Sequence, residues 1–139
     1  KSERIMVRKI ILDVNIWISI FLKKKMNYFL DIVVHQNLEF ISDENLRNEL
    51  IDVISRKKFS STFSVEDIVD AIDFFDAIST FVPTEKKFSG SPDIKDDYLF
   101  DLANQSETKI IVTGDKKLLD FKTENISLIT FSEFLQEFK

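Results

Sequence analysis

The stretch Lys9-Ile10-Ile11-Leu12-Asp13-Val14-Asn15 combines a short apolar segment with an acidic residue directly after it. Its β-branched residues predict a strand over residues 7–12, and the helical spacing of the apolar residues from 15 to 22 predicts a helix next. Asp13 is therefore expected at the carboxyl end of a strand. In parallel α/β folds, ligands bind in the crevice outside the carboxyl ends of the strands.

The rest of the chain alternates between strand-like and helix-like segments. Further strands are expected over residues 38–41, 80–83, 109–113 and 126–129. Helices are expected over residues 27–34, 64–78, 93–105 and 132–138, with another beginning at Ser42 or Asp43. This alternation favours parallel strands with helices on both faces. We expect a single α/β domain over residues 1–139, a three-layer α/β/α sandwich around a central, mainly parallel sheet.

Composition excludes several kinds of site. The chain has no cysteine, which excludes disulfide frameworks and thiolate zinc sites, and its single histidine excludes multi-histidine metal sites. The net charge of −5 has the wrong sign for general adhesion to nucleic acid. Basic runs at residues 56–58 and 116–117 could still form a local patch. No apolar run approaches the ~20 residues that span a bilayer, so we expect a cytoplasmic protein without a membrane partner.

A second acidic residue, Asp115, ends another apolar segment. It follows residues 110–113, and Gly114 permits a tight turn close to a ligand at this point. Thr113 can add a hydroxyl group to the same place. Asn15, two residues after Asp13, could orient a metal-bound water or cap a helix.

Two more acidic residues are expected on the inward faces of helices. Glu49 lies nearly on the same side of its helix as Leu46, beside the apolar stripe. Asp96 precedes Leu99 by three residues and points with the buried face, whereas Asp97 is turned away by about 100°. Asp97, like the nearby Asp93, is expected either to support the site from behind or to be solvated.

Each of these acids could simply cap a helix or interact with its dipole. Gathered at one crevice, however, several carboxylates cannot all stay ionised unless a cation neutralises them. Mg²⁺ prefers such oxygen ligands and keeps waters besides. We therefore predict a metal site for phosphate chemistry. Its proposed members are Asp13, Glu49, Asp96 and Asp115, with Asn15, Thr113 and Asp97 in support.

Four segments resemble the sequence motifs of PIN-domain nucleases. Residues 10–19 resemble the first motif, a strand followed by Asp-x-Asn, and residues 42–50 resemble the second, whose inward Glu is an active-site acid. Residues 93–103 resemble the third motif, and residues 111–119 the fourth. Their order and spacing are kept over nearly the whole chain. In particular, the chain looks like the branch that contains the toxins of bacterial toxin–antitoxin pairs.

The resemblance implies a Mg²⁺- or Mn²⁺-dependent endoribonuclease that hydrolyses single-stranded or structured RNA. It also implies an antitoxin protein as partner and a homodimer. Water would be the nucleophile and would leave a 5′-phosphate. The RNA backbone would pass near Lys57, Lys58 and Lys116. Many relatives carry a further acid where this chain has Lys117, which leaves a second metal position open.

Other functions remain as alternatives. A catalytically degenerate PIN domain could act as an RNA- or protein-binding module, and it would show no metal-dependent cleavage. A phosphoacceptor receiver domain needs an Asp after a middle strand, and the strands over 38–41 and 80–83 lack one at the required place. A phosphatase of the Asp-nucleophile type needs Asp-x-Asp, and Asn15 cannot serve as its general acid.

Overall fold

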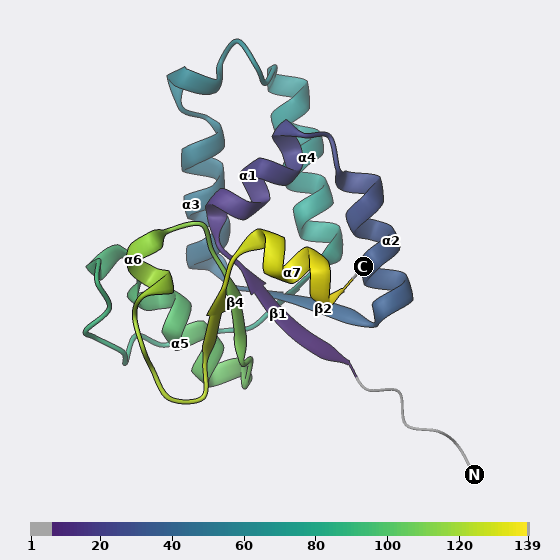
Figure 1. Ribbon diagram of the computed structural model, residues 1–139. Helices are drawn as coiled ribbons and strands as arrows, with labels where there is room; N and C mark the ends of the chain where they lie inside the picture. Colours follow the sequence, from purple (N-terminus) through teal and green to yellow (C-terminus); the bar gives the residue numbers. More distant parts are fainter. Residues whose placement is uncertain (1–6, 139) are drawn as a thin grey trace.

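A computed structural model of the protein describes residues 7–138 and shows a central sheet of parallel strands (Figure 1). The strands are β1 (Arg8–Leu12), β2 (Leu38–Ser42), β3 (Ser79–Phe81), β4 (Ile110–Val112) and β5 (Ser127–Ile129). Their spatial order is β3-β2-β1-β4-β5, and all four pairings are parallel. Consecutive parallel strands require crossover connections, and helices supply them here.

The helices alternate with the strands along the chain. Two connect β1 to β2 and two connect β2 to β3, namely α1 (Val14–Leu22), α2 (Met26–Gln36), α3 (Glu44–Ile54) and α4 (Val65–Ile78). A 3-10 turn (Lys57–Phe59) lies between α3 and α4. After β3 come a second 3-10 turn (Ile94–Asp96), α5 (Asp97–Ser106), α6 (Lys116–Leu119) and, after β5, α7 (Phe131–Glu137). Figure 1 shows α5 and α6 beside β4, with α3 next to α5.

The three-layer α/β/α fold expected from the sequence is confirmed, as are the five strands. Two local differences have physical causes. The segment 93–105 is a 3-10 turn followed by a helix, because the Asp93 carboxylate accepts the Lys95 N–H and holds the chain in a tighter turn. The short helix α6 had no expected counterpart, since four residues are too few for an apolar period. The helix α4 begins with a capping box formed by Ser64 and Asp67.

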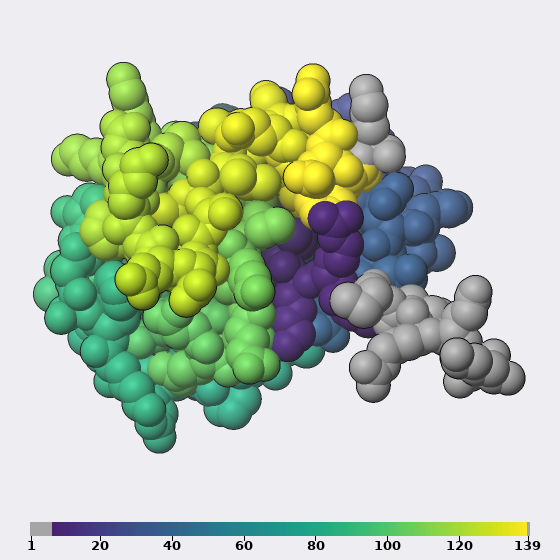
Figure 2. Space-filling model, turned by 60° about the horizontal axis from the view of Figure 1, so that its bottom comes forward, coloured from purple at the N-terminus to yellow at the C-terminus, as the bar shows by residue number. Residues whose placement is uncertain are grey.

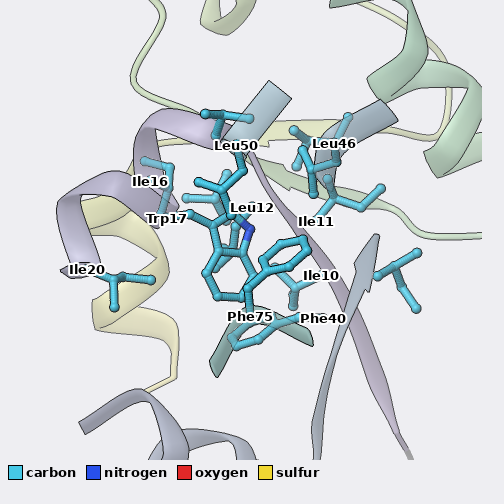
Figure 3. Close-up of a cluster of buried hydrophobic side chains, with 14 of the residues drawn as sticks. Ile10, Ile11, Leu12, Ile16, Trp17, Ile20, Phe40, Leu46, Leu50 and Phe75 are labelled. Carbon is cyan, nitrogen blue, oxygen red and sulfur yellow. The ribbon is translucent and has the colours of Figure 1, made fainter. Parts of the chain in front are cut away.

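The centre of the sheet is covered on both faces. Ile10, Ile11 and Leu12 in β1 are each 0% exposed, although successive side chains of a strand point to opposite faces. Figure 3 shows Trp17 of α1 in the middle of one apolar layer, next to Phe40 of β2 and Phe75 of α4. The centroid of its ring system lies 5.6 Å from that of Phe40 and 4.8 Å from that of Phe75, both in edge-on geometry.

Aromatic rings also close the rest of the core. Phe100 of α5 lies between Phe88 and Phe121, with ring centroids 4.9 Å and 5.4 Å away. Phe134 and Phe138 near the carboxyl end of the chain are 0% exposed, which confirms ordinary packing as their role. Figure 2 shows this carboxyl-terminal segment (yellow) beside the start of β1 (purple). None of the helices within residues 7–138 combines the length and apolar character needed to cross a membrane.

The Trp17→Ala variant tests the packing around β1. We expect it to lower the free energy of unfolding by about 3–5 kcal/mol, because a fully buried aromatic side chain leaves a cavity between α1, β2 and α4. Chemical denaturation monitored by circular dichroism measures the change. Val34→Ala on α2 is the control, since Val34 is 66% exposed and its loss is expected to cost less than about 0.5 kcal/mol. Equal losses in the two variants would contradict the packing described here.

Candidate active site

The pairing of β1 with β4 brings two distant parts of the chain together. Leu12 pairs with Val112, and the Asp13 N–H donates to the Val112 carbonyl at 2.9 Å. Thr113 follows immediately, and its hydroxyl donates to Asp13 Oδ2 at 2.8 Å. The same hydroxyl accepts the Asp115 N–H at 3.1 Å. Thr113 therefore ties the ends of both strands to each other, at the position where the sequence predicted a supporting hydroxyl.

Asp13 is a buried carboxylate, only 5% exposed. Burial raises its pKa, while the hydrogen bonds from the Thr113 hydroxyl and from the Val14 N–H, at 2.7 Å, lower it. The negative charge of Asp115 adds a further increase. Asp13 caps α1 and Asp115 caps α6. Each residue therefore caps a helix while the Asp115 charge also acts on Asp13.

Glu49 reaches the same region from α3. It is half-buried between Leu46 and Leu50, which are 0% exposed. Burial raises the pKa of Glu49, the Tyr98 hydroxyl lowers it, and the charge of Asp13 raises it again. The position beside the apolar stripe that the sequence predicted is therefore the observed one.

The carboxyl group of Asp96 is strongly perturbed by its surroundings. Burial, followed by the charges of Asp13, Asp93, Glu49 and Asp115, raises its pKa to about 7. The charges of four carboxylates thus act on Asp96 at one end of the sheet. Asp93 belongs to the group more closely than the sequence indicated, since its charge acts on Asp96 more strongly than that of Glu49.

Asp97 lies next to Asp96 but serves another purpose. Its carboxylate is buried, 3% exposed, so it is not solvated, and it accepts hydrogen bonds from the Ser91 N–H and hydroxyl. The Ser91 hydroxyl, acting more strongly than burial, lowers the pKa of Asp97. The Lys86 ammonium lies 3.6 Å from the other carboxylate oxygen. Asp97 therefore anchors the segment between β3 and α5.

Two further residues of α5 continue this anchoring, which no pattern in the sequence indicated. Asp101 accepts the N–H groups of Lys87 and Phe88, and the Gln105 side chain exchanges hydrogen bonds with the backbone of Glu85. Residues 97, 101 and 105 are four apart, which puts them on one side of the helix. The long segment 84–92 is therefore attached along α5, and α5 carries Asp96 at its start.

The other predicted supporting and binding residues lie at the surface. Asn15 is exposed, as are Lys57, Lys58 and Lys116. The Lys58 ammonium lies 5.1 Å from the centroid of the Phe59 ring. Two cations, Lys95 and Arg56, lower the pKa of Glu49. Their effects on this pKa are smaller than those of burial, of the Tyr98 hydroxyl and of the Asp13 charge. The sequence grouped Arg56 with Lys57 and Lys58, and did not point to Lys95.

The carboxylates can be tested against the needs of a divalent ion. Within residues 7–138, no three acidic or histidine side chains lie close enough to enclose an ion by themselves. Mg²⁺ commonly binds through one or two carboxylates and keeps several waters. Asp96, with a pKa near 7, and the four carboxylates whose charges act on it match that hydrated ion in charge and in the type of donor atom. The residues therefore fit a water-mediated site better than a closed cage.

The Asp96→Asn variant tests this repulsion. A carboxyl group whose pKa is higher in the folded than in the unfolded protein favours folding at low pH, and that contribution is lost as pH rises to about 7. At pH 8 without divalent ions, we expect the free energy of unfolding of the variant to exceed that of the wild type by about 1–2 kcal/mol. This figure allows for solvent screening of the charges. The gain should vanish towards pH 4.

Denaturation curves at both pH values measure the effect. Asp73→Asn, on the exposed face of α4, is the matched control and should leave stability unchanged at both. A stability loss at pH 8 in Asp96→Asn would contradict the arrangement of charges described above.

Comparison with known proteins bears on this site. The family model of the PIN domain matches residues 9–117. The crystal structure of VapBC2 from Rickettsia felis bound to a DNA fragment from their promoter is similar, with a TM-score of 0.61 and 15% identity over 88% of this chain and 98% of that one. PAE2754 from Pyrobaculum aerophilum is also similar, with a TM-score of 0.57 and 13% identity over 96% of this chain and 98% of that one.

No curated protein matches the chain by sequence. At 13–15% identity, the two crystal structures show the fold alone. The family model carries more weight, because it spans β1 to the start of α6 and so contains Asp13, Glu49, Asp96 and Asp115. The chain belongs to the PIN-domain family.

Proposed function

We propose that the protein is a metal-dependent endoribonuclease that hydrolyses RNA phosphodiester bonds. PIN domains are generally nucleases, which supports the general class. The single observation that carries the proposal is the group of carboxylates around Asp96, whose pKa is raised to about 7 by burial first and then by the charges of those carboxylates. A polyanionic substrate would not approach such a group without a cation, so the site favours phosphate chemistry with a divalent ion.

Asp13, Asp96 and Asp115 would hold one or two Mg²⁺ or Mn²⁺ ions, directly or through water. A bound ion of this kind lowers the pKa of a coordinated water and offsets charge on the phosphate. Thr113 keeps Asp13 and the start of α6 in register, and so fixes the spacing between two of these groups. Asp96 must release its proton to bind a cation, so binding should strengthen as pH rises to about 7.

Glu49 would accept the proton of the attacking water. Its pKa is raised by burial, which makes its carboxylate a stronger base than an exposed one. The Tyr98 hydroxyl and the charge of Lys95 partly counteract this rise. Glu49 is thus suited to take up a proton near the phosphate and to return it to solvent.

A protein partner is also proposed. The similar Rickettsia felis structure is of VapBC2, a complex bound to promoter DNA. By analogy, this chain would be the toxin of a bacterial toxin–antitoxin pair, a homodimer in the cytoplasm that an antitoxin protein blocks. Co-expression with the protein encoded beside it, followed by co-purification, tests this part separately from catalysis.

The proposed role of the metal-binding acids can be tested with RNA cleavage. We expect the wild type to cleave single-stranded RNA with Mg²⁺ or Mn²⁺ and to stop when EDTA is added. Asp13→Asn should lower the cleavage rate by more than the roughly 10–100-fold that loss of a residue behind a metal ligand costs. Asp73→Asn is the matched control and should keep the wild-type rate.

Gel analysis of a labelled RNA measures these rates, and isothermal titration calorimetry measures Mn²⁺ binding. A folded wild type that binds Mn²⁺ and cleaves no RNA would favour the degenerate binding module instead. Cleavage that persists in EDTA would overturn the metal dependence.

The second prediction concerns the exposed lysines after α3. For a single-stranded nucleic acid, the logarithm of the binding constant falls linearly with the logarithm of the salt concentration. The slope of this line steepens by about 0.7 for each phosphate that the protein neutralises. The double variant Lys57→Ala/Lys58→Ala should therefore reduce this slope by about 1.4 and weaken binding equally for different RNA sequences. Lys116→Ala should reduce it by about 0.7. Fluorescence anisotropy in EDTA, which prevents cleavage, measures the binding.

Lys109→Ala is the control for these variants. Lys109 is exposed and directly precedes β4, at the end of the sheet opposite the carboxylates. An equal change of slope in Lys109→Ala would show that the lysines act only through the net charge of the protein.

A further inference from the structure

A cavity of about 260 Å³ lies where the start of α3, the segment after β3 and the start of α5 meet. Its lining includes Asn45 and Thr84, and also Ile94, Lys95 and Tyr98. The volume is close to the roughly 300 Å³ of the smallest ligand pockets, so it suits one ring system of a larger ligand. None of the four proposed metal-binding acids lines it, and the proposed chemistry therefore leaves this cavity without a role.

The cavity adjoins the candidate active site along both helices. Asn45 precedes Glu49 in α3 by four residues, which is about one turn, or about 6 Å along the helix axis. Lys95 and Asp97, which line the cavity, flank Asp96 in the chain. The helices α3 and α5 themselves contact each other. An RNA strand bound at the carboxylates would therefore place a neighbouring nucleotide over the cavity.

Asn45 and Thr84 offer two neighbouring hydrogen-bond acceptors to this cavity. The Asn45 amide nitrogen donates to Asp43 Oδ2 at 3.2 Å, so the amide carbonyl oxygen remains without a protein donor. The Thr84 hydroxyl donates its proton to the same carboxylate oxygen, at 2.7 Å, and its lone pairs remain. Because both groups bind one oxygen atom, they lie side by side. A single group with two N–H bonds would satisfy both acceptors.

Ile94 and Tyr98 give the cavity an apolar part. Ile94 is 77% exposed, although it is a large apolar side chain at the rim of a polar site. The Tyr98 oxygen is excluded from solvent, so the ring, and not the hydroxyl, is what a ligand would meet. Aliphatic and aromatic side chains of this kind bind the flat face of a nucleic-acid base without regard to its sequence.

Charge distinguishes a base from a phosphate at this place. The carboxylates of Asp97 and Asp101 line the cavity, where they accept hydrogen bonds from backbone N–H groups of the protein. Their charges would repel a phosphate inside the cavity, whereas an uncharged base meets no such repulsion. The exposed Lys95 at its rim would instead attract a phosphate of the RNA backbone.

We propose that this cavity binds one base of the RNA and favours the bases with an exocyclic amino group, namely adenine, cytosine and guanine, over uracil. The amino group would donate to Asn45 and Thr84 while the ring packs against Ile94. Uracil has no amino group, and its carbonyl oxygens would face the two acceptors. The inference rests on the proposed nuclease function and deepens it, because it names residues that would decide the sequence preference.

Titration with free nucleosides tests the cavity without metal and without cleavage. We expect cytidine and adenosine to shift the NMR signals of the Asn45 side-chain amide and of the Ile94 methyl groups. Uridine should bind about 2–10-fold more weakly, which is the effect of one lost hydrogen bond. Equal affinities for cytidine and uridine would overturn the preference. Unchanged signals of both residues with every nucleoside would overturn the cavity as a base-binding site.

Two variants separate the polar and apolar parts of the cavity. Asn45→Ala should remove most of the preference for cytidine over uridine, because it removes one acceptor. Ile94→Ala leaves the hydrogen bonds of Asp43 intact and should weaken the binding of both nucleosides alike. Asn104→Ala is the matched control, since Asn104 is exposed in the last turn of α5 and does not line this cavity. A full preference for cytidine in Asn45→Ala would show that the proposed acceptor is wrong.

The RNA cleavage assay distinguishes this inference from the proposed function. A wild type that cleaves RNA but binds no nucleoside would retain the nuclease function and overturn the base-binding cavity. A wild type that binds cytidine in preference to uridine but cleaves no RNA would retain the cavity and overturn the nuclease function. If arginine amide shifts the Asn45 and Ile94 signals and nucleosides do not, a basic side chain of a protein partner is the ligand and the proposal is wrong.

Discussion

The parallel pairing of β1 with β4 is the contact on which the candidate site depends. Asp13 and Asp115 are about a hundred residues apart in the chain, and they meet only because Leu12 and Val112 lie in register. The Thr113 hydroxyl then connects them, donating to one and accepting from the backbone of the other. The connection from β3 to β4 carries α5 across the sheet and delivers Asp96 to the same edge.

The fold uses acidic residues in two ways that differ in how their charge is compensated. Asp43 at the end of β2 is 2% exposed and accepts hydrogen bonds from the Leu46 N–H, the Asn45 amide and the Thr84 hydroxyl. Asp97 and Asp101 likewise have protein donors, and they attach a long segment to α5. These acids are satisfied inside the protein. The pKa of Asp96, by contrast, is raised by its partial burial and then by the charges of other carboxylates, and such a group favours an external cation.

The acids of the candidate site differ in how deeply they are buried. Asp13 is fixed by two hydrogen bonds at the end of β1, whose last three residues are fully buried. Glu49 and Asp96 are only half-buried. In the proposed function these residues would hold a hydrated ion, which would supply charge neutralisation for chemistry on a phosphodiester.

Local patterns in the sequence predicted the five strands and the α-helices other than α6, but not that Asp97 is more deeply buried than Asp96. An apolar strand before Asp13 or Asp115, and an apolar stripe beside Glu49, follow from periods of two and 3.6 residues that a reader can count. Only the tertiary structure decided how each acid is used. Asp96 and Asp97 are neighbours in sequence, yet one faces four carboxylates and the other binds Ser91. The burial of the Tyr98 hydroxyl is likewise visible only in the tertiary structure. Charge compensation depends on groups distant along the chain, and no local period encodes their positions.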